Sequence, residues 1–184
     1  MSIQILQPHN RFRIGSKTRA NLAGVHPAIV AMVEQAITLT PADFCVVEGG
    51  GMRSPEQAAD NAKRGTGVLN SMHIRQPDGY GHAVDLVAFA DGKPNWNRLE
   101  LYKLIRPAVL QAAAMVGIPI QHGADWDIDG ITAEKGEWDW PHWQFPKRPD
   151  RIAAAYDQLN EWRKALGLSQ IHLANLEPNH WLSA

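Results

Sequence analysis

The chain has 184 residues, of which 45% are hydrophobic and 20% are charged, and its formal net charge is -1 at pH 7. This length is enough for one domain with a hydrophobic core, and the near-neutral charge does not favour binding to nucleic acid. A single cysteine, Cys45, excludes an intrachain disulfide. The sequence has no apolar run long enough to cross a bilayer and no signal-peptide pattern, so we expect no membrane insertion.

The first predicted elements surround a short buried strand at residues 44–47. Before this strand, apolar residues at helical spacing from Pro27 onward predict a helix. After it come three glycines and Arg53, followed by Ser54 and Gln57, which have the spacing of a capping box at a helix start. Arg53 is therefore predicted at a strand-to-helix corner. There it could pair with a nearby glutamate on the surface or take part in a functional site.

The stretch from residue 71 to residue 85 concentrates titratable side chains. It holds two histidines, His73 and His82, and it ends in an alternating pattern that predicts a strand. Because successive strand residues point to opposite faces, Asp85 and His82 are predicted on opposite faces. A carboxylate on an otherwise apolar strand is costly unless it is paired, and a metal ion would be such a partner.

A second polar cluster occupies residues 139–145. Pro141 favours an extended conformation for the residue before it, and the following alternation places His142 and Gln144 on one face of a short strand. One histidine and one aspartate of the first cluster, together with His142, make three ligands. This is the number of protein ligands that a catalytic zinc ion takes. Asp139 remains close in sequence as a candidate base.

The two clusters together resemble the Ser-x-His…Gly-x-Ala-x-Asp and Asp-x-x-His signatures of a family of zinc peptidases. This family includes D-alanyl-D-alanine carboxypeptidases and the L-alanyl-D-glutamate peptidase endolysins of bacteriophages, and the resemblance extends over residues 12 to 146. It implies zinc bound by His73, Asp85 and His142, with Asp139 as the base. It also implies that Arg53 faces the site and helps to hold the substrate or the oxyanion.

The spacing after His73 departs from the family pattern. Seven residues, 74 to 80, separate this histidine from Gly81, which is more than the family usually has. Either His73 or His82 could therefore be the ligand. We expect His73, because its Ser-x-His context is intact and because His82 falls on the strand face opposite Asp85. Three further residues are expected to support the ligand rings through hydrogen bonds: Ser71, His82 and Gln144.

The second half of the chain contains an acidic loop. A helix is predicted from residue 97 to residue 115, with a kink or break at Pro107. Residues 125–130, Asp-Trp-Asp-Ile-Asp-Gly, then have the form of the opening of an EF-hand calcium loop. The acid usual at position 12 is absent, because Gly136 occupies that position. Some endolysins of the resembled family are similar here and are regulated by calcium. The alternatives are a calcium site or a solvated acidic turn, formed by Asp125, Asp127 and Asp129.

A final amphipathic helix is predicted at residues 150–166. We expect one α+β domain of the Hedgehog/DD-peptidase type, with a small, mostly antiparallel sheet and helices packed around it. Residues 1–148 would form the zinc peptidase domain, and residues 149–184 a helix and tail packed on the same domain.

The resemblance implies a monomeric phage endolysin that hydrolyses the L-alanyl-D-glutamate bond of peptidoglycan stem peptides. It would be made in the host cytoplasm without a signal peptide and released by a holin. There are two alternatives. One is a D-alanyl-D-alanine carboxypeptidase of the same family, and the other is a cell-wall-binding domain without catalytic activity.

Overall fold

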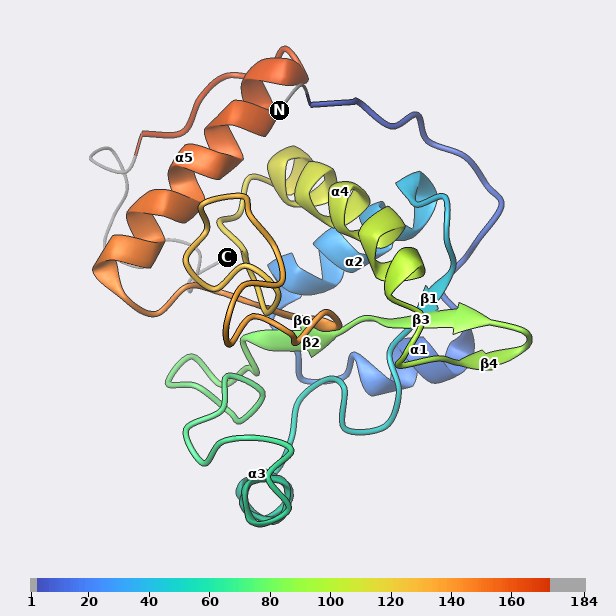
Figure 1. Cartoon of the computed structure of the whole chain (residues 1–184), viewed down its shortest axis with the longest axis vertical. Helices are drawn as coiled ribbons and strands as arrows, with labels where there is room; N and C mark the ends of the chain where they lie inside the picture. The colour runs from blue at the N-terminus through green and yellow to red at the C-terminus, as the bar shows by residue number, and fades with distance from the viewer. Residues whose placement is uncertain (1–2, 173–184) are drawn as a thin grey trace.

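The computed structural model describes residues 3–172, and Figure 1 shows how its helices and strands are arranged. The described residues contain these elements in chain order: α1 (Ser16–Asn21), α2 (Pro27–Leu39), β1 (Phe44–Cys45), α3 (Pro55–Lys63), β2 (Ala83–Asp85), β3 (Val87–Ala90), β4 (Lys93–Pro94), α4 (Leu99–Val116), β5 (Gln121–His122), β6 (His142–Gln144) and α5 (Pro149–Ala165). Helix α4 packs between α2 and α5, whereas α3 projects away from the other helices (Figure 1). The end of the predicted C-terminal tail lies outside the described residues.

The strands form two antiparallel sheets of three strands each, in the orders β1-β3-β4 and β2-β6-β5. The predicted α+β class with antiparallel pairing is confirmed, although the strands divide into two sheets instead of one. Strands β2 and β3 are separated only by Leu86. The backbone nitrogen of Leu86 donates to the carbonyl of Pro141, next to β6. The backbone nitrogen of Phe89, in β3, donates to the carbonyl of Asp43, next to β1. One extended run of chain therefore changes partner and joins the two sheets.

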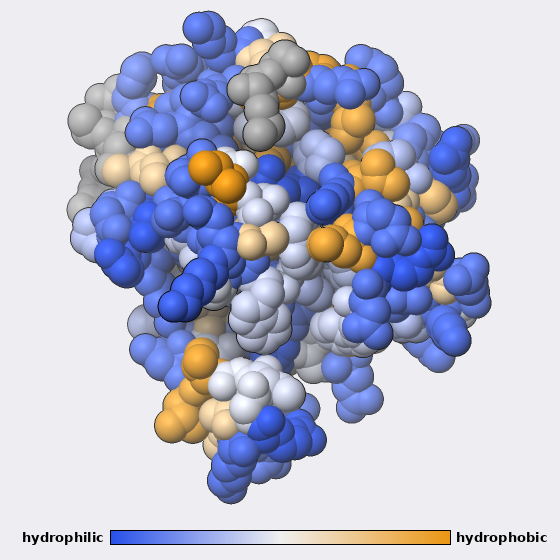
Figure 2. Space-filling view, viewed as in Figure 1, coloured by the Kyte–Doolittle hydropathy of each residue, from blue (hydrophilic) through white to orange (hydrophobic). Residues whose placement is uncertain are grey.

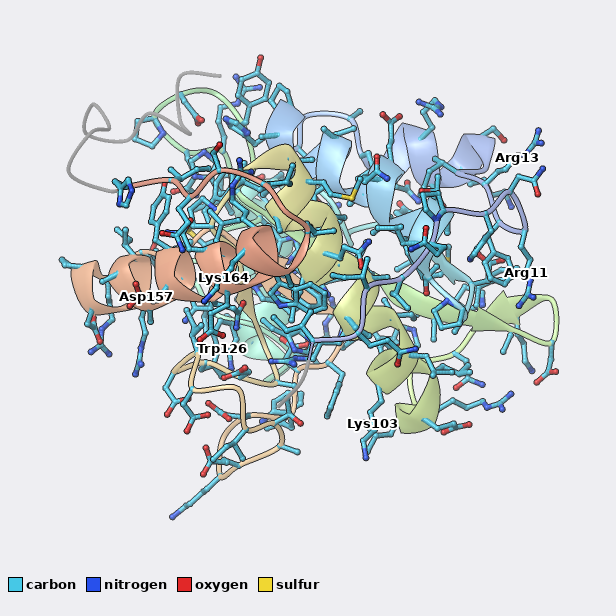
Figure 3. The ribbon with its side chains drawn as sticks, turned by 90° about the horizontal axis from the view of Figure 1, so that it is seen from above. Arg11, Arg13, Lys103, Trp126, Asp157 and Lys164 are labelled. Carbon is cyan, nitrogen blue, oxygen red and sulfur yellow. The ribbon has the colours of Figure 1, made fainter. Side chains whose placement is uncertain are left out.

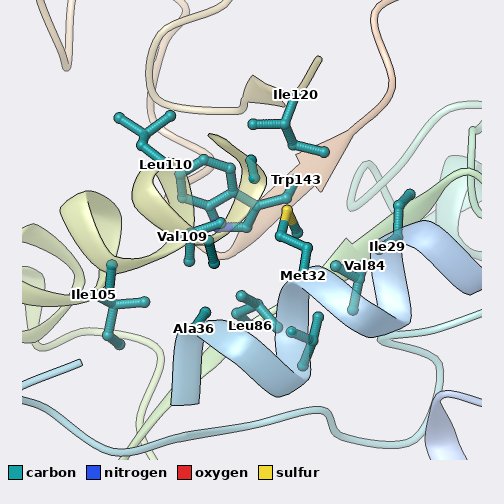
Figure 4. Packing of buried hydrophobic residues seen from close by; sticks show 14 of the residues in the cluster. Ile29, Met32, Ala36, Val84, Leu86, Ile105, Val109, Leu110, Ile120 and Trp143 are labelled. Carbon is teal, nitrogen blue, oxygen red and sulfur yellow. The ribbon is translucent and has the colours of Figure 1, made fainter. Parts of the chain in front are cut away.

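The hydrophobic core lies between these strands and the helices α2 and α4 (Figure 4). Ile29 and Met32 of α2 pack there with Val109 of α4 and with Trp143 of β6, which is only 1% exposed. Replacing a buried tryptophan of this kind with alanine typically costs about 3–5 kcal/mol of stability. Because β6 alternates, burial of Trp143 turns its neighbour His142 toward the opposite face. Core packing thus fixes the register that positions the site.

Helix α3 begins where the sequence predicts, whereas helix α4 continues beyond the predicted break. Ser54 caps α3 and forms the predicted capping box with Gln57. Helix α4 continues through Pro107, so the break predicted there is absent from this helix. A proline leaves the carbonyl of the residue four positions earlier without its helical donor. That residue is Lys103, which is exposed, so water can hydrogen-bond to its carbonyl and the helix is not interrupted.

The C-terminal helix α5 packs along α4. Tyr156, Leu159 and Trp162 of α5 contribute to the hydrophobic core, and Arg163 donates to the carbonyl of Ala114 near the end of α4 at 2.7 Å. Such a bond satisfies one of the carbonyls left free at a helix C-terminus. None of the helices in residues 3–172 combines the length and apolarity that a bilayer-crossing segment requires. The division of the chain at residue 148 stays a prediction.

Candidate metal centre and active site

The pairing of β2 with β6 brings two of the expected ligands together. Asp85 lies directly opposite His142 in this antiparallel ladder, and residues paired in this way point to the same face. Asp85 Oδ1 lies 3.0 Å from His142 Nδ1. His73 comes from the loop before β2, and its Nε2 lies 3.3 Å from Asp85 Oδ1 and 3.2 Å from His142 Nδ1. All three side chains are buried.

The second nitrogen of each imidazole ring already has an acceptor. His73 Nδ1 donates to the carbonyl of Gly51 at 2.7 Å, and His142 Nε2 donates to Gln144 Oε1 at 3.0 Å. In the neutral form of each ring, these bonds leave a lone pair on the nitrogen that faces Asp85. Three acceptor atoms therefore converge within 4.8 Å of one another. This donor set fits a metal ion, since acceptors on the outer nitrogens fix the tautomer that a metal ligand needs.

Hydrogen bonds from outside the group hold its members in place. Asp85 Oδ2 accepts a hydrogen bond from Arg53 Nη2, and Arg53 Nε donates to the carbonyl of Gly49. Ser71 Oγ accepts from the backbone nitrogen of His73 at 3.2 Å. Burial tends to raise the pKa of Asp85, but in the metal-free protein His73 and His142 more than offset it when their rings are protonated, so this pKa lies well below the usual value. Asp85 is therefore held as a carboxylate.

Asp139 lies in the turn that leads into β6. Its backbone oxygen accepts from the nitrogen of His142 at 3.1 Å, and its nitrogen donates to the carbonyl of Gly123 at 3.1 Å. Burial raises the pKa of the Asp139 carboxyl, and His142 partly counteracts this effect. A Cβ atom on Gly123 would come within 2.4 Å of the Asp139 carbonyl oxygen, so this turn requires glycine. The sequence did not predict a role for Gly123. The chain has fifteen glycines, and no local pattern distinguishes this one from the others.

These residues line a cleft with a volume of about 1100 Å³. Helix α3 and the loop after it contribute one part of the lining, and Trp126 and Trp138 contribute another. Figure 2 shows a mostly hydrophilic face on which hydrophobic residues form small, separate patches, with a lobe projecting at the end of the molecule that carries α3. A cleft of this size can hold several residues of an extended ligand. Arg53, His73, Asp85, Asp139, His142 and Gln144 all line it.

Residues 10–145 match the family model described as phage L-alanyl-D-glutamate peptidase. The chain belongs to this family. It is 33% identical over 138 residues to the L-alanyl-D-glutamate peptidase of Escherichia phage T5. The aligned residues cover 71% of this chain and 96% of that protein. Among solved structures, it is similar to the Serratia marcescens L-Ala D-Glu endopeptidase ChiX. That match has 31% identity and a TM-score of 0.58, and it covers 73% of this chain and 90% of the other. The resemblance inferred from the two motifs is confirmed.

In this peptidase the second histidine of the first motif faces away from the metal group. His82 Nε2 lies 2.7 Å from Asp78 Oδ2, and the imidazole packs edge-on against His26 and Phe145. Asp78 belongs to the extra residues 74–80, so His82 anchors this insertion to the core. The structure thus brings His73, and not His82, to Asp85 and His142. His82 therefore does not make the expected hydrogen bond to a ligand ring. The carbonyl of Gly51 makes such a bond instead, to Nδ1 of His73.

The acidic loop forms a second group of carboxylates. Oxygens of Asp125, Asp127 and Asp129 lie within 4.8 Å of one another, as do those of Asp127, Glu134 and Glu137. Within residues 3–172, one buried oxygen each of Asp125, Asp127 and Glu137 has no hydrogen-bond partner. Glu137 follows the vacant position 12 by one residue, so the loop does have an acid near the place of the EF-hand glutamate. Buried carboxylate oxygens without donors are costly, and a cation would satisfy them.

Two arginines from neighbouring helices hold the acidic loop. Arg106 of α4 forms an ion pair with Asp125 Oδ2, and Arg151 of α5 donates to the backbone carbonyl of Asp127 at 2.7 Å. Trp126, the residue between these two aspartates, is labelled in Figure 3. Burial raises the pKa of Asp125, and Arg106 partly offsets this effect. Neither arginine carries a sequence pattern that links it to the loop, so only the tertiary structure reveals these contacts.

Trp126 connects the acidic loop with the metal group. Glu137 Oε1 accepts hydrogen bonds from the backbone nitrogens of Trp126 at 2.7 Å and Asp127 at 3.3 Å. The Trp126 ring in turn packs on the His142 ring, with 5.5 Å between the centroids. The conformation of the acidic loop is therefore coupled by direct contact to a residue of the metal group.

Proposed function

We propose that this peptidase binds zinc through His73 Nε2, Asp85 Oδ1 and His142 Nδ1 and hydrolyses the L-alanyl-D-glutamate bond of peptidoglycan stem peptides. The observation that carries this proposal is the convergence of three buried acceptor atoms in the cleft, with the outer nitrogen of each imidazole already hydrogen-bonded. Two histidines and one carboxylate are a typical protein ligand set of catalytic zinc.

The zinc site, Asp139 and Arg53 would each have a separate role in hydrolysis. Zinc at this position would supply polarisation of the scissile carbonyl and a lowered pKa of water. Asp139 takes a proton from the attacking water and delivers it to the leaving amine. Its raised pKa makes it a stronger base toward the water and allows it to hold the proton until the amine leaves. Arg53 orients Asp85 through its contact with Oδ2, and its positive charge favours the negative charge that develops on the carbonyl oxygen.

Mass spectrometry of purified peptidoglycan after incubation with the zinc-loaded protein tests the proposal. We expect a new amino terminus on D-glutamate, and the Asp139→Asn variant serves as a matched control without turnover. Release of free D-alanine would instead identify a D-alanyl-D-alanine carboxypeptidase. Intact peptidoglycan in the presence of stoichiometric zinc would favour a cell-wall-binding domain.

The acidic loop is proposed as a calcium site formed by Asp125, Asp127 and Asp129, with Glu137 in place of the missing acid. The support is the set of buried carboxylate oxygens without partners in the described part of the chain. Calcium prefers six to eight oxygen ligands, which carboxylates and backbone carbonyls of such a loop can supply. Bound calcium would order the loop and, through Trp126, hold His142 in place.

We also propose that the protein is a monomeric endolysin that is made in the host cytoplasm and reaches the cell wall after release by a holin. Membership of a phage peptidase family supports the endolysin role. Expression in a bacterial host provides the test. Lysis is expected only when a holin is co-expressed, and lysis without any membrane-permeabilising protein would contradict release by a holin. Light scattering of the purified protein measures its mass and checks the monomer.

A further inference from the structure

Two tryptophans of the cleft have exposed rings. Within residues 3–172, Trp96 is 53% exposed and Trp138 is 73% exposed, whereas Trp140, Trp143 and Trp162 are buried. Trp96 precedes α4 and Trp138 precedes the turn into β6, and both line the cleft that holds the metal group. Exposed apolar area is unfavourable by about 25 cal/mol per Å². Both exposed tryptophans of the described residues thus belong to the cleft.

The chemistry of the proposed substrate places a sugar next to these rings. In a stem peptide, the nitrogen of the L-alanine is acylated by the lactyl group of an N-acetylated amino sugar. Only one residue therefore separates the bond to be cleaved from the lactyl group, and one residue spans at most about 3.6 Å. Trp138 is the chain neighbour of Asp139, the proposed base. A saccharide attached so close to the scissile bond lies within reach of the cleft that Trp138 also lines.

We propose that Trp138 and Trp96 form a saccharide subsite for the amino sugar that carries the stem peptide. A pyranose ring has an apolar C–H face that packs on an indole, and it has polar edges that need hydrogen bonds. Side chains with amide groups line the same cleft and can bond to these edges: Gln57, Asn61 and Asn97. This inference rests on the proposed function, since it assumes that the stem peptide is the substrate.

Two soluble substrates test the subsite: a disaccharide-tetrapeptide and the same tetrapeptide without sugar. Trp138→Ala should lower kcat/KM for the disaccharide-tetrapeptide by about tenfold, a typical effect of losing one aromatic packing contact. The loss for the free tetrapeptide should be less than about twofold, because the peptide contacts remain. Trp96→Ala should behave in the same way, and Trp138→Phe should retain most of the preference. Leu104→Ala serves as the matched control, since this exposed apolar residue of α4 does not line the cleft.

The outcomes separate the subsite from the activity itself. Equal losses on both substrates, or no loss on either, would overturn the saccharide subsite while leaving the peptidase intact. If the wild-type protein does not turn over the free tetrapeptide, calorimetric affinities of both compounds for zinc-loaded Asp139→Asn give the same comparison. A wild-type protein that cleaves neither compound would instead refute the proposed function.

Discussion

His73 Nε2 and His142 Nδ1 lie 3.2 Å apart, and the other nitrogen of each ring already donates to an oxygen. Two lone pairs at this distance, beside the carboxylate of Asp85, repel one another unless a proton or a metal cation lies between them. The hydrogen bonds of the outer nitrogens thus prepare the group for a metal before any metal arrives, and they define which atoms would bind it.

Removing one of these nitrogens should remove the metal. We expect His142→Ala to lose stoichiometric zinc and peptidase activity together, because two ligands rarely retain zinc. Elemental analysis of the purified protein gives the zinc content. His82→Ala is the control and should keep its zinc, since His82 bonds to Asp78 instead of the metal group. Zinc retained in His142→Ala, or lost in His82→Ala but kept in His73→Ala, would contradict the ligand assignment.

Asp139→Asn separates metal binding from proton transfer. The variant should fold and keep its zinc but lose about 10²–10⁴-fold in kcat, the usual contribution of a general acid–base group. Zinc content and turnover on purified peptidoglycan provide the two measurements. Near-normal turnover would exclude Asp139 as the base and would direct attention to Glu137, the carboxylate nearest to it in the chain.

Calcium should stabilise the zinc-loaded protein through the acidic loop. A ligand at a hundred times its dissociation constant stabilises the folded state by about 2.7 kcal/mol, which is measurable as a rise in Tm. Asp127→Asn and Glu137→Gln should abolish this rise, because each removes the charge of a carboxylate with a buried, unpartnered oxygen. Glu161→Gln, at an exposed position of α5, should leave it unchanged.

A second measurement follows the calcium loop without any assay of activity. Terbium commonly replaces calcium, and the Trp126 indole within the loop can sensitise its luminescence. Calcium should displace terbium from the wild-type protein. An undiminished terbium signal in Asp127→Asn, together with an unchanged calcium effect on Tm, would reduce the loop to an acidic surface turn.

The stability of the metal-free protein should fall in mild acid because of His122. Its Nε2 lies 2.9 Å from the carbonyl of Trp140, its ring stacks on Trp143, and burial lowers its pKa to about 3. In the unfolded chain the imidazole titrates near its ordinary pKa of 6.5. As the pH falls below that value, the unfolded state takes up a proton that the folded state does not. His122 therefore costs the folded state about 2 kcal/mol between pH 7 and pH 5.

Urea unfolding of the metal-free protein at these two pH values measures this effect. His122→Phe keeps a flat ring against Trp143 but cannot titrate, so its stability should depend less on pH. An identical pH dependence in His122→Phe and the wild-type protein would show that other groups cause the acid sensitivity.

The sequence predicted the residues of the metal group better than their relation in space. Asp85 stands out as a carboxylate in an otherwise apolar strand, and His142 stands out with Gln144 as the polar face of a strand whose other face is aromatic. Their direct pairing depends on the register between β2 and β6, which the packing of Trp143 sets and which no local pattern encodes. The position of His73 depends on its hydrogen bond to the carbonyl of Gly51. These two residues are 22 positions apart in the sequence and come together only when the chain folds.

The acidic loop shows the same limit. Its three aspartates are a local pattern, so the sequence predicted that their carboxylates lie close together. The missing acid at position 12 could not be assigned from spacing, because Glu137 reaches the loop through backbone bonds to Trp126 and Asp127. The ion pair of Arg106 with Asp125 joins a helix to this loop, and such long-range contacts follow only from tertiary packing.

His142 and Trp143 are neighbours on opposite faces of a strand that is only three residues long. A slip of one residue in this strand would turn the indole toward the metal group and the imidazole into the core. Selection for hydrolysis and selection for a well-packed interior therefore act on the same short segment. In a mutagenesis library, substitutions at position 143 or at its core neighbours, such as Met32 and Val109, should emerge as inactive, metal-poor proteins, although none of these side chains belongs to the metal group.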